Sequence, residues 1–420
     1  MGYVQNQELY KVSVSTGKMQ VWSGCTVGAE IHTTFGQLGG KMQTQITVAT
    51  PKNVGRSNET TAEEQANLEL MADYKAQVDN KHYRTTKDLA REFAESNREP
   101  RKILDYKKGF CKMSDTLYSS KKFNGSRACV LNGDYLSKIG KVEEIKVEHL
   151  KSAIDKLQIA TGGVYFDAEV YAHGLSLQRI RSAFLKPVKT EKEIIKIAKD
   201  RLKSRGKVEE SKKMKFIEQA IDYLGYNPNE DAGKLKLYVF DIPVLGVPFV
   251  DRLEKMRTLE DVVVSSGLED VIKFEYPVIT CCHEERMEML EEVVNQGYEG
   301  YVHYEVEGMY EFGRRSTNAQ KSKPRYDSEA RVVGVIKDKR GNGTLECIAC
   351  DTLDNIPFKC VMKVDRRDGT SHPDKSYETC LEMVGKWITF SYEELSDKGV
   401  PTKPVGEIER ECDSEGNPLN

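Results

Sequence analysis

Two adjacent lysines, Lys121 and Lys122, stand in the stretch SSKKFNGSRACVL, ahead of Asn124-Gly125 and of Arg127. An Asn-Gly pair between two strand-like runs is typical of a short hairpin, and lysines beside such a turn are usually solvated. A neutral lysine amine can also act as a nucleophile. The stretch alone favours the turn, so residues elsewhere in the chain must decide between the two interpretations.

Acidic and aromatic residues recur at the ends of other strand-like runs. The run VYFDAEVY puts Asp167 and Glu169 on one face of a strand, because side chains two apart point the same way. The run KLYVFDIP carries Phe240 beside an aspartate, and GYEGYVHY offers Glu299 at the entrance to a strand. Taken singly, each run also fits an exposed sheet face or an ordinary core.

A second lysine pair, Lys321 and Lys323, lies in AQKSKPRYD, where a strand would direct both ammonium groups to one side. Together these residues are what nucleotidyl transfer needs: a lysine nucleophile, carboxylates for a divalent metal, an aromatic face for a base, and cations for a phosphate. An amine with the ordinary pKa of ~10.4 is rarely neutral at pH 7, and nearby cations favour its neutral form.

The composition limits the kind of protein. At ~150 residues per domain, 420 residues suggest about three domains. The formal net charge is only −3, so a nucleic-acid partner would have to meet local basic patches. No apolar run approaches the ~18 residues of a membrane span, and MGYVQNQELY lacks a signal pattern. We expect an intracellular, cytoplasmic protein with no membrane contact.

The ten cysteines and seven histidines do not have the spacing of a metal site or of a disulfide framework. Cys281 and Cys282 are adjacent. Cys347 and Cys350 lie three apart in a strand-like run and would face opposite sides. We expect reduced, structural cysteines.

The first part of the chain, residues 1–84, is expected to form a small β-rich domain with a helix. The runs LYKVSV, MQVW and TQITVAT are strand-like, and FGQLGGKM is typical of a turn between strands. Thr61 and Glu64 form a capping box ahead of an apolar stripe with a spacing of four residues.

The remainder is expected to divide at about residue 325. Residues 85–100 predict a linker helix, and residues 101–325 alternate strands with helices. Within them, the charged stretch 191–223 predicts a solvated helical insertion, with nucleic-acid contact as the alternative. Residues 326–420 contain closely spaced strands typical of a small barrel.

The order along the chain of the stretches that carry the lysines, the carboxylates and Phe240 resembles that in the ATP-dependent DNA ligases of the covalent nucleotidyltransferase superfamily. The resemblance is greatest to the compact phage-type and bacterial forms. The resemblance covers roughly residues 100–410. Its matches are KFNGSR, YLSKIGK, FDAEVY, YVFDI, EGYV and KSKP. It implies an α+β fold: a nucleotidyltransferase core of ATP-grasp-like antiparallel sheets, followed by a C-terminal OB barrel.

The resemblance also implies roles for individual residues, including Lys122 as the lysine that carries AMP. Counting back from Gly125 selects Lys122 over Lys121. Glu169 and Glu299 become the candidate metal ligands. The remaining implied roles are phosphate or ribose contact by Arg127, ribose contact by Glu169, stacking on adenine by Phe240, and binding of the α-phosphate by Lys321 and Lys323.

This chain departs from the family pattern at several positions. Asn124 replaces the usual aspartate, and this removes a negative charge close to the nucleophile. Lys138 stands where the family commonly has arginine, so a bidentate contact is lost there. The closing stretch GVPTKPVGEIERE makes Arg410 a candidate for the ATP pyrophosphate, and Arg314 is a further candidate for DNA or pyrophosphate.

The implied activity is the sealing of nicks in duplex DNA by a monomer that uses ATP with Mg²⁺ or Mn²⁺. An RNA ligase or an mRNA-capping guanylyltransferase on the same core remains an alternative, as does an inactive nucleic-acid-binding protein. Residues 1–84 faintly resemble the WGR domain, a nucleic-acid-binding module, with a purely structural appendage as the alternative. Basic side chains around its turns would serve DNA contact: Lys11, Lys18, Lys41, Lys52 and Arg56.

Overall fold

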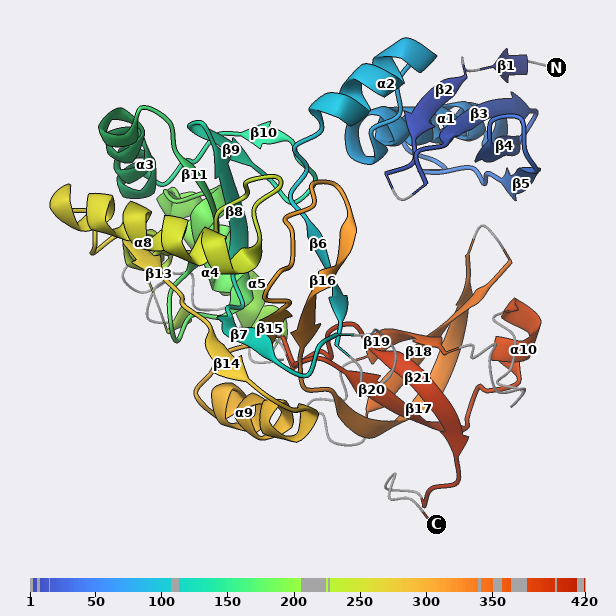
Figure 1. Ribbon diagram of the computed structural model, residues 1–420. Helices are drawn as coiled ribbons and strands as arrows, with labels where there is room; N and C mark the ends of the chain where they lie inside the picture. Colours follow the sequence, from blue (N-terminus) through green and yellow to red (C-terminus); the bar gives the residue numbers. More distant parts are fainter. Residues whose placement is uncertain are drawn as a thin grey trace.

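The structure is a computed structural model with a mixed α+β architecture, as the sequence predicts. A small N-terminal sheet, a central pair of sheets with flanking helices, and a barrel follow one another along the chain (Figure 1). Residues 205–223, which are the second part of the charged stretch 191–223, lie outside the described residues, as does Cys350. The described residues are 3–5, 8–14, 16–106, 113–204, 224–225, 227–338, 341–349, 357–363, 376–396, 399–413 and 419.

The N-terminal sheet is covered on one face by helix α1 (Ala62–Lys81). The predicted capping box is present, with Thr61 Oγ1 accepting from the Glu64 amide at 3.2 Å. The apolar stripe of α1 buries Ala66 and Leu70 against the sheet. The strands of this sheet are β1 (Tyr3–Gln5), β2 (Leu9–Val12), β3 (Met19–Val27), β4 (Glu30–Gln37) and β5 (Met42–Val48).

Two sheets form the core of the molecule. The order of the first sheet is β10-β9-β8-β11-β12-β13, and that of the second is β14-β7-β15-β16-β6. Their strands are β6 (Lys102–Asp105), β7 (Leu117–Lys122), β8 (Ser126–Leu131), β9 (Asp134–Leu136), β10 (Val142–Glu143), β11 (Tyr165–Tyr171), β12 (Lys236–Asp241), β13 (Ile272–Phe274), β14 (Val278–Thr280), β15 (Gly300–Tyr304) and β16 (Arg315–Ser322).

Helices cover the outer faces of these sheets and connect them to the N-terminal part (Figure 1). Helix α2 (Lys87–Ser96) lies within the predicted linker. The described start of the charged insertion is helical, and Ile194 and Ala198 on it are buried. The other helices of this part are α3 (Glu148–Thr161), α4 (Leu177–Leu185), α5 (Glu191–Ser204), α7 (Pro228–Lys234), α8 (Phe249–Ser265) and α9 (His283–Asn295).

The predicted Asn-Gly hairpin is wrong, because β7 and β8 belong to different sheets. Lys122 pairs with Gly300 in one sheet, whereas Arg127 pairs with Glu169 in the other. Between them the chain passes so close to β11 that a Cβ on Gly125 would lie 2.3 Å from the Val170 carbonyl oxygen. The turn therefore joins the two sheets and sets Lys122 and Arg127 beside the space between them.

The last described segments form the predicted barrel, closed in the order β17-β18-β19-β21-β20. Cys347 and Cys360 are buried in its interior, and the cysteines among the described residues are free thiols, as predicted. The elements of the barrel are β17 (Tyr326–Lys337), β18 (Gly343–Ala349), β19 (Pro357–Met362), α10 (Tyr377–Leu381), β20 (Trp387–Tyr392) and β21 (Val405–Arg410).

Among the helices of the described residues, none has the length and apolar character needed to cross a membrane.

Candidate nucleotide-binding site

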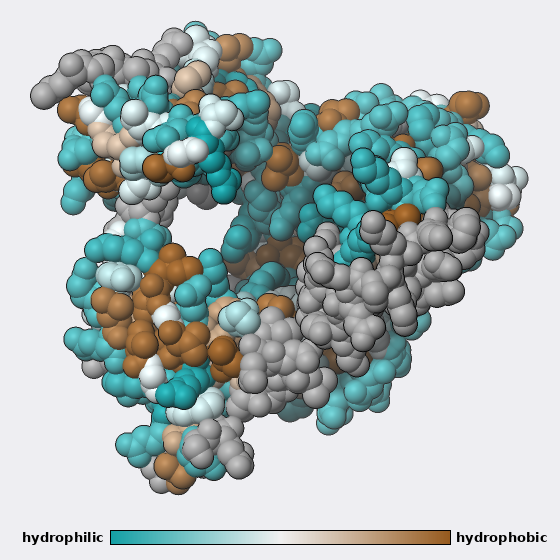
Figure 2. All heavy atoms as spheres, turned by 180° about the vertical axis from the view of Figure 1, so that it is seen from behind, coloured by the Kyte–Doolittle hydropathy of each residue, from teal (hydrophilic) through white to brown (hydrophobic). Residues whose placement is uncertain are grey.

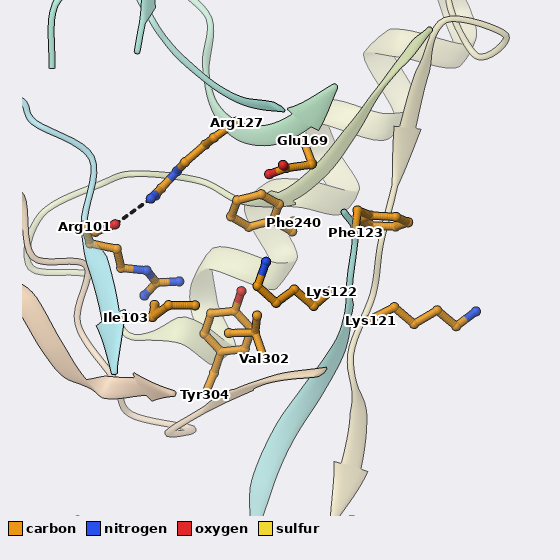
Figure 3. A pocket seen from close by; sticks show the side chains of 10 residues that line it. All are labelled: Arg101, Ile103, Lys121, Lys122, Phe123, Arg127, Glu169, Phe240, Val302 and Tyr304. Atoms are coloured by element: carbon orange, nitrogen blue, oxygen red, sulfur yellow. Dashed lines mark hydrogen bonds between the residues drawn. The ribbon is translucent and has the colours of Figure 1, made fainter. Parts of the chain in front are cut away.

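A cavity of about 110 Å³ opens between the two core sheets, and four of the sequence-predicted site residues line it: Lys122, Arg127, Glu169 and Phe240. Figure 3 shows Lys122 pointing into this cavity, beneath the ring of Phe240 and toward Glu169. Charged, aromatic and aliphatic side chains share the wall. The lining residues are Arg101, Ile103, Lys121, Lys122, Phe123, Arg127, Glu169, Phe240, Val302 and Tyr304.

The two adjacent lysines diverge, as alternation along a strand requires. Lys122 Nζ forms an ion pair with Glu299 beside the cavity. Lys121 points to the opposite side in Figure 3, and its Nζ lies 5.1 Å from the centre of the Tyr298 ring. Of the two amines, only that of Lys122 is therefore directed at a molecule bound in the cavity.

Glu299 joins Lys122 to Lys323. One carboxylate oxygen pairs with each lysine, and the side chains of all three residues are at least four-fifths buried. Burial raises the pKa of Glu299, whereas the positive charges of Lys122 and Lys323 and their hydrogen bonds lower it. The net effect is a lowered pKa. A carboxylate and two cations thus converge where charge on a phosphate would have to be neutralised.

Arg127 is fixed by a buried carboxylate. Its Nε donates to Asp167 Oδ1 at 2.8 Å, and its Nη2 donates to the other oxygen of the same aspartate. Tyr310 donates its hydroxyl to Asp167 at 2.7 Å, and Arg127 Nη1 donates to the Arg101 carbonyl at 2.5 Å. The guanidinium is therefore oriented before any ligand binds, and Asp167 acts by holding it.

Glu169 lies across the cavity from Lys122. Burial raises its pKa to about 7, and the negative charges of Glu299 and Asp167 add to this effect, while Lys122 and Arg127 oppose it. A carboxylate with such a pKa gains by accepting hydrogen bonds from a ribose or by binding a cation. Phe240 presents its ring beside it, 6.0 Å from the Arg127 guanidinium carbon.

The second predicted lysine pair does not act as one unit. Lys321 Nζ pairs with Asp105 at 3.2 Å, whereas Lys323 pairs with Glu299 and Glu393. Lys321 instead lies in a cluster of positively charged side chains around Lys138. Burial lowers the pKa of Lys138, and the neighbouring cations Lys321, Lys403, Lys102 and Arg127 lower it further.

Two predicted residues lie elsewhere. Arg410 ends β21 opposite Trp387, and at ~3.3 Å per residue it lies roughly 17 Å along the strand from Val405. Arg314 Nε donates to the Val14 carbonyl at 2.9 Å, so it contacts the N-terminal part. Neither arginine joins the residues at the cavity.

The structure adds residues that the sequence did not single out. Arg101 is buried, lines the cavity, and donates to Asp241 at 2.6 Å. Glu393 of the barrel pairs directly with the Lys323 ammonium at 3.1 Å. Lys403 of the barrel pairs with the same Glu393 carboxylate at 2.7 Å. Arg101 precedes a short strand, a setting that carries no functional signal in the sequence, whereas Lys403 lies in the closing stretch GVPTKPVGEIERE, from which the sequence pattern indicated Arg410 instead.

The basic side chains predicted to contact DNA differ in exposure. Lys18, Lys41 and Arg56 are exposed on the N-terminal part. Lys11 is less exposed than these three residues, because its ammonium lies over the Tyr83 ring and its side chain is half-buried. Burial is the main cause that lowers the pKa of Lys11. Lys52, also exposed, pairs with Glu69 at 3.2 Å.

The carboxylates at the cavity suit a cation that is held partly by a substrate. Within the described ranges, no three or more histidine, cysteine, aspartate or glutamate side chains converge to form a metal site. Mg²⁺ commonly binds through one or two carboxylates together with substrate phosphates. Glu169 lines the cavity and Glu299 pairs with Lys122 beside it, so two carboxylates are available there for such a cation.

Comparison with known protein families gives one match over more than half of the chain. Residues 100–323 match the model described as "ATP dependent DNA ligase domain". No curated protein matches the sequence. The matched residues include Lys122, Arg127, Glu169 and Lys323.

The solved ligase structures with TM-scores above 0.5 share the fold of this chain. A structure from a study of DNA binding by Lig E DNA ligases is 17% identical, with a TM-score of 0.51 over 74% of this chain and 98% of that chain. A structure titled Pmar-Lig is 16% identical, with a TM-score of 0.55 over 84% of this chain and 78% of that chain. The ATP complex of the bacteriophage T7 ATP-dependent DNA ligase is 15% identical over 74% of this chain and 99% of that chain, at a TM-score of 0.40.

Proposed function

The chain belongs to the ATP-dependent DNA ligases, and from this premise we propose that it seals nicks in duplex DNA through AMP carried on Lys122. The observation that supports the proposal best is the position of Lys122: its ammonium enters the cavity between Glu299 and Phe240, while Lys121 points away. Use of ATP and a DNA substrate follow from the family.

The proposed reaction has three steps. In the first, the Lys122 ammonium releases a proton to solvent, the neutral Nζ attacks the α-phosphorus of ATP, a P–N bond forms as the nitrogen loses a second proton, and the bond to the leaving pyrophosphate breaks. In the second, a 5′-phosphate oxygen of DNA attacks the same phosphorus, the P–N bond breaks, and AMP passes to the DNA. In the third, the neighbouring 3′-hydroxyl attacks the 5′-phosphate, and AMP leaves as the phosphodiester bond forms.

The described side chains supply positioning and charge in these steps. Lys323 and Lys321 would neutralise charge on the phosphate, and Phe240 would stack on adenine. Glu299 accepts a hydrogen bond from the Lys122 ammonium before reaction and holds that ammonium at the cavity. Arg127, oriented by Asp167, would contact the ribose or a phosphate.

A divalent cation fits the same site. Glu169 and Glu299 would hold it as Mg²⁺ or Mn²⁺, together with phosphate oxygens. When bound, such an ion would neutralise negative charge on the transferred phosphoryl group.

The shape of the molecule is compatible with a duplex substrate. Figure 2 shows an opening between the N-terminal part and the barrel, with the core beside it. In our proposal the exposed cations Lys18, Lys41 and Arg56 contact the DNA backbone, and residues 1–84 act as a DNA-binding domain of WGR type. The division at residues 84, 100 and 325, and a monomeric state, belong to the same proposal.

The test combines labelling with sealing. The protein is incubated with ATP or GTP labelled at the α-phosphate, and then with DNA carrying a nick, a cohesive end or a blunt end, and with nicks that contain RNA strands. We expect labelling by ATP alone and the fastest sealing on nicked DNA. Labelling by GTP would favour a capping guanylyltransferase, faster sealing of RNA would favour an RNA ligase, and no labelled protein would leave a nucleic-acid-binding function.

A further inference from the structure

A layer of polar side chains lies behind the nucleotide cavity, on the far face of the second core sheet. Val302 and Tyr304 of β15 line the cavity, so His303 between them points to the opposite face. Helix α9 covers this face, where its Arg286 donates to Thr280 Oγ1 at 3.2 Å. The members of the layer are at most 4% exposed: Ser119, Thr280, His303, Gln320 and Ser322.

Within this layer, His303 joins three neighbouring strands. Its Nδ1 lies 2.8 Å from Ser119 Oγ on β7, and its Nε2 lies 2.5 Å from Ser322 Oγ on β16. Ser119, His303 and Ser322 thus form a clamp across β7, β15 and β16. Strand β7 ends at Lys122, and Lys323 follows directly after β16. The clamp therefore connects the strand of the predicted nucleophile with the strand that presents a phosphate-binding lysine.

The ring at the centre of the clamp is neutral. Burial lowers the pKa of His303 to about 3, and the positive charges of Arg286 and His283 lower it as well. A neutral imidazole has one nitrogen that donates and one that accepts. The bonds to Ser119 and Ser322 use both nitrogens.

The hydrogens of the clamp run in one direction. Thr280 Oγ1 donates its hydrogen to the Leu117 carbonyl at 3.3 Å, so in its 3.0 Å contact with Ser119 it accepts. Ser119 therefore accepts from His303 Nδ1, and His303 Nε2 accepts from the Ser322 hydroxyl. Because each hydroxyl and each ring nitrogen has a partner, the network favours one arrangement of the three strands.

The end of β16 is held at Ser322, the residue before Lys323. Its backbone lies so close to β15 that a Cβ on Gly300 would be 2.1 Å from the Ser322 carbonyl oxygen. Its hydroxyl is bound by His303. The close backbone approach and the side-chain bond together fix the point from which Lys323 projects.

Stability alone does not require polar side chains in this layer. A buried polar group that loses its partner is costly, whereas apolar side chains of similar volume would fill the space without that risk. A fully bonded polar network instead specifies one geometry. Here the geometry so specified is that of the strands that end at Lys122 and Lys323.

We infer that Ser119, His303 and Ser322 are positioning residues for the transfer of AMP. From behind the sheet, the clamp holds the strand ends of Lys122 and Lys323 at the spacing that attack on the α-phosphorus requires. The inference rests on the proposed function for the roles of these two lysines. The clamp itself lies on the face opposite the cavity and makes no contact with the nucleotide.

Loss of the clamp should slow the transfer of AMP more than it weakens ATP binding. Attack requires the reacting atoms to lie ~3–3.5 Å apart in one orientation, and a misplacement of about 1 Å can cost about 100-fold in rate. Binding draws in addition on Arg127, Glu169 and Phe240, which belong to the other core sheet. Those three residues keep their positions when a hydroxyl of the clamp is removed.

The experiment measures the rate of adenylation and the affinity for nucleotide separately. The time course of labelling at saturating ATP gives the rate, and calorimetry with α,β-methylene ATP gives the Kd without chemistry. We expect Ser322→Ala and Ser119→Ala each to slow adenylation by about 10- to 100-fold and to change the Kd by less than about 3-fold. Ser322→Thr keeps the hydroxyl and should recover most of the rate.

Thr280→Val serves as the matched control. It removes one buried hydroxyl from the same polar layer, but β14, which carries Thr280, contributes no residue to the lining of the cavity. This variant should lower the melting temperature about as much as Ser322→Ala does, without slowing adenylation. All variants are compared at a temperature where thermal unfolding shows each of them to be folded.

Adenylation of folded Ser322→Ala at the wild-type rate would overturn the positioning role, and so would equal slowing in Thr280→Val. A loss that comes entirely from weaker nucleotide binding, or a Ser322→Thr variant as slow as Ser322→Ala, would overturn it as well. If the wild-type protein takes up no label, the proposed reaction itself is refuted, and the positioning role with it. That result is distinct from failure of the clamp alone, in which wild-type protein and clamp variants are labelled equally fast.

Discussion

The pair of Arg127 and Asp167 provides a quantitative test of how the site is built. Asp167→Asn would remove a carboxylate that is 0% exposed and accepts two hydrogen bonds from Arg127 and one from Tyr310. The guanidinium would keep its bond to the Arg101 carbonyl but lose the counterion that orients it. We therefore expect the variant to lose both stability and self-adenylation.

The loss of stability can be worked from the contacts. Breaking a buried ion pair by removing one partner costs ~3–5 kcal/mol, and the asparagine oxygen keeps one acceptor, which places the cost near the lower end. At ~2–4 °C per kcal/mol for a unit of 150–250 residues, the melting temperature should fall by about 6 to 12 °C. Self-adenylation should fall as well, because an unpaired Arg127 no longer has one preferred orientation.

A matched pair elsewhere in the core separates these two effects. Asp231 is also buried and accepts from Arg179 Nε at 2.9 Å and from Nη2 at 2.6 Å. Asp231→Asn should therefore lower the melting temperature by a similar amount without lowering adenylation of the folded protein. Both variants are compared by thermal unfolding and by the rate of AMP labelling at a temperature where each is folded. Unchanged melting of Asp167→Asn, or equal loss of adenylation in both variants, would refute the reasoning.

Three further predictions follow from the same structure. In the absence of nucleotide and divalent cations, wild-type protein should lose stability relative to Glu169→Gln as pH rises from about 4.5 to about 7, by at most ~3 kcal/mol. The reason is that the raised pKa of Glu169 makes the folded state hold the proton more tightly than the unfolded state does. Equal pH profiles of the two proteins in urea titrations would contradict this. Glu299→Gln and Lys323→Ala should each reduce nick sealing by at least ~10²-fold, the scale for one preorganised charge, and near-normal sealing by folded variants would remove these residues from the site. A truncation starting near residue 85 should weaken nick binding and flatten its salt dependence by nearly one unit per lost phosphate contact, while labelling of Lys122 persists; unchanged binding over a salt series would return the N-terminal part to a structural role.

Much of the fold was predictable because local patterns specify it. The capping box at Thr61 fixes the start of α1, and strand alternation separates Lys121 from Lys122. The order of the motifs correctly indicated the ligase family. The hairpin prediction failed because an Asn-Gly pair indicates a turn but does not determine whether the strands on either side of it pair with each other. Here those two strands, β7 and β8, belong to different sheets.

The contacts between barrel and core could not be predicted in the same way. Glu393 and Glu394 read in the sequence as charged residues after a strand, and nothing local indicates that they meet Lys323 and Asn124, which lie 70 and 270 positions away. The closing stretch indicated Arg410, whereas Lys403 is the residue of that stretch that lies near Lys323, since β21 carries Arg410 toward its other end. The long-range packing of the barrel against the core determines both the contacts of Glu393 and Glu394 and the placement of Lys403 near Lys323.

The central claim, that Lys122 carries AMP, is tested most directly by locating the modified residue. Wild-type protein, Lys122→Ala and Lys121→Ala are incubated with ATP and a divalent cation, digested, and analysed by mass spectrometry for a peptide with one added AMP. We expect the adduct on Lys122 in the wild-type protein and in Lys121→Ala, and no adduct in Lys122→Ala. AMP on Lys121, or an adduct that survives in Lys122→Ala, would contradict the account.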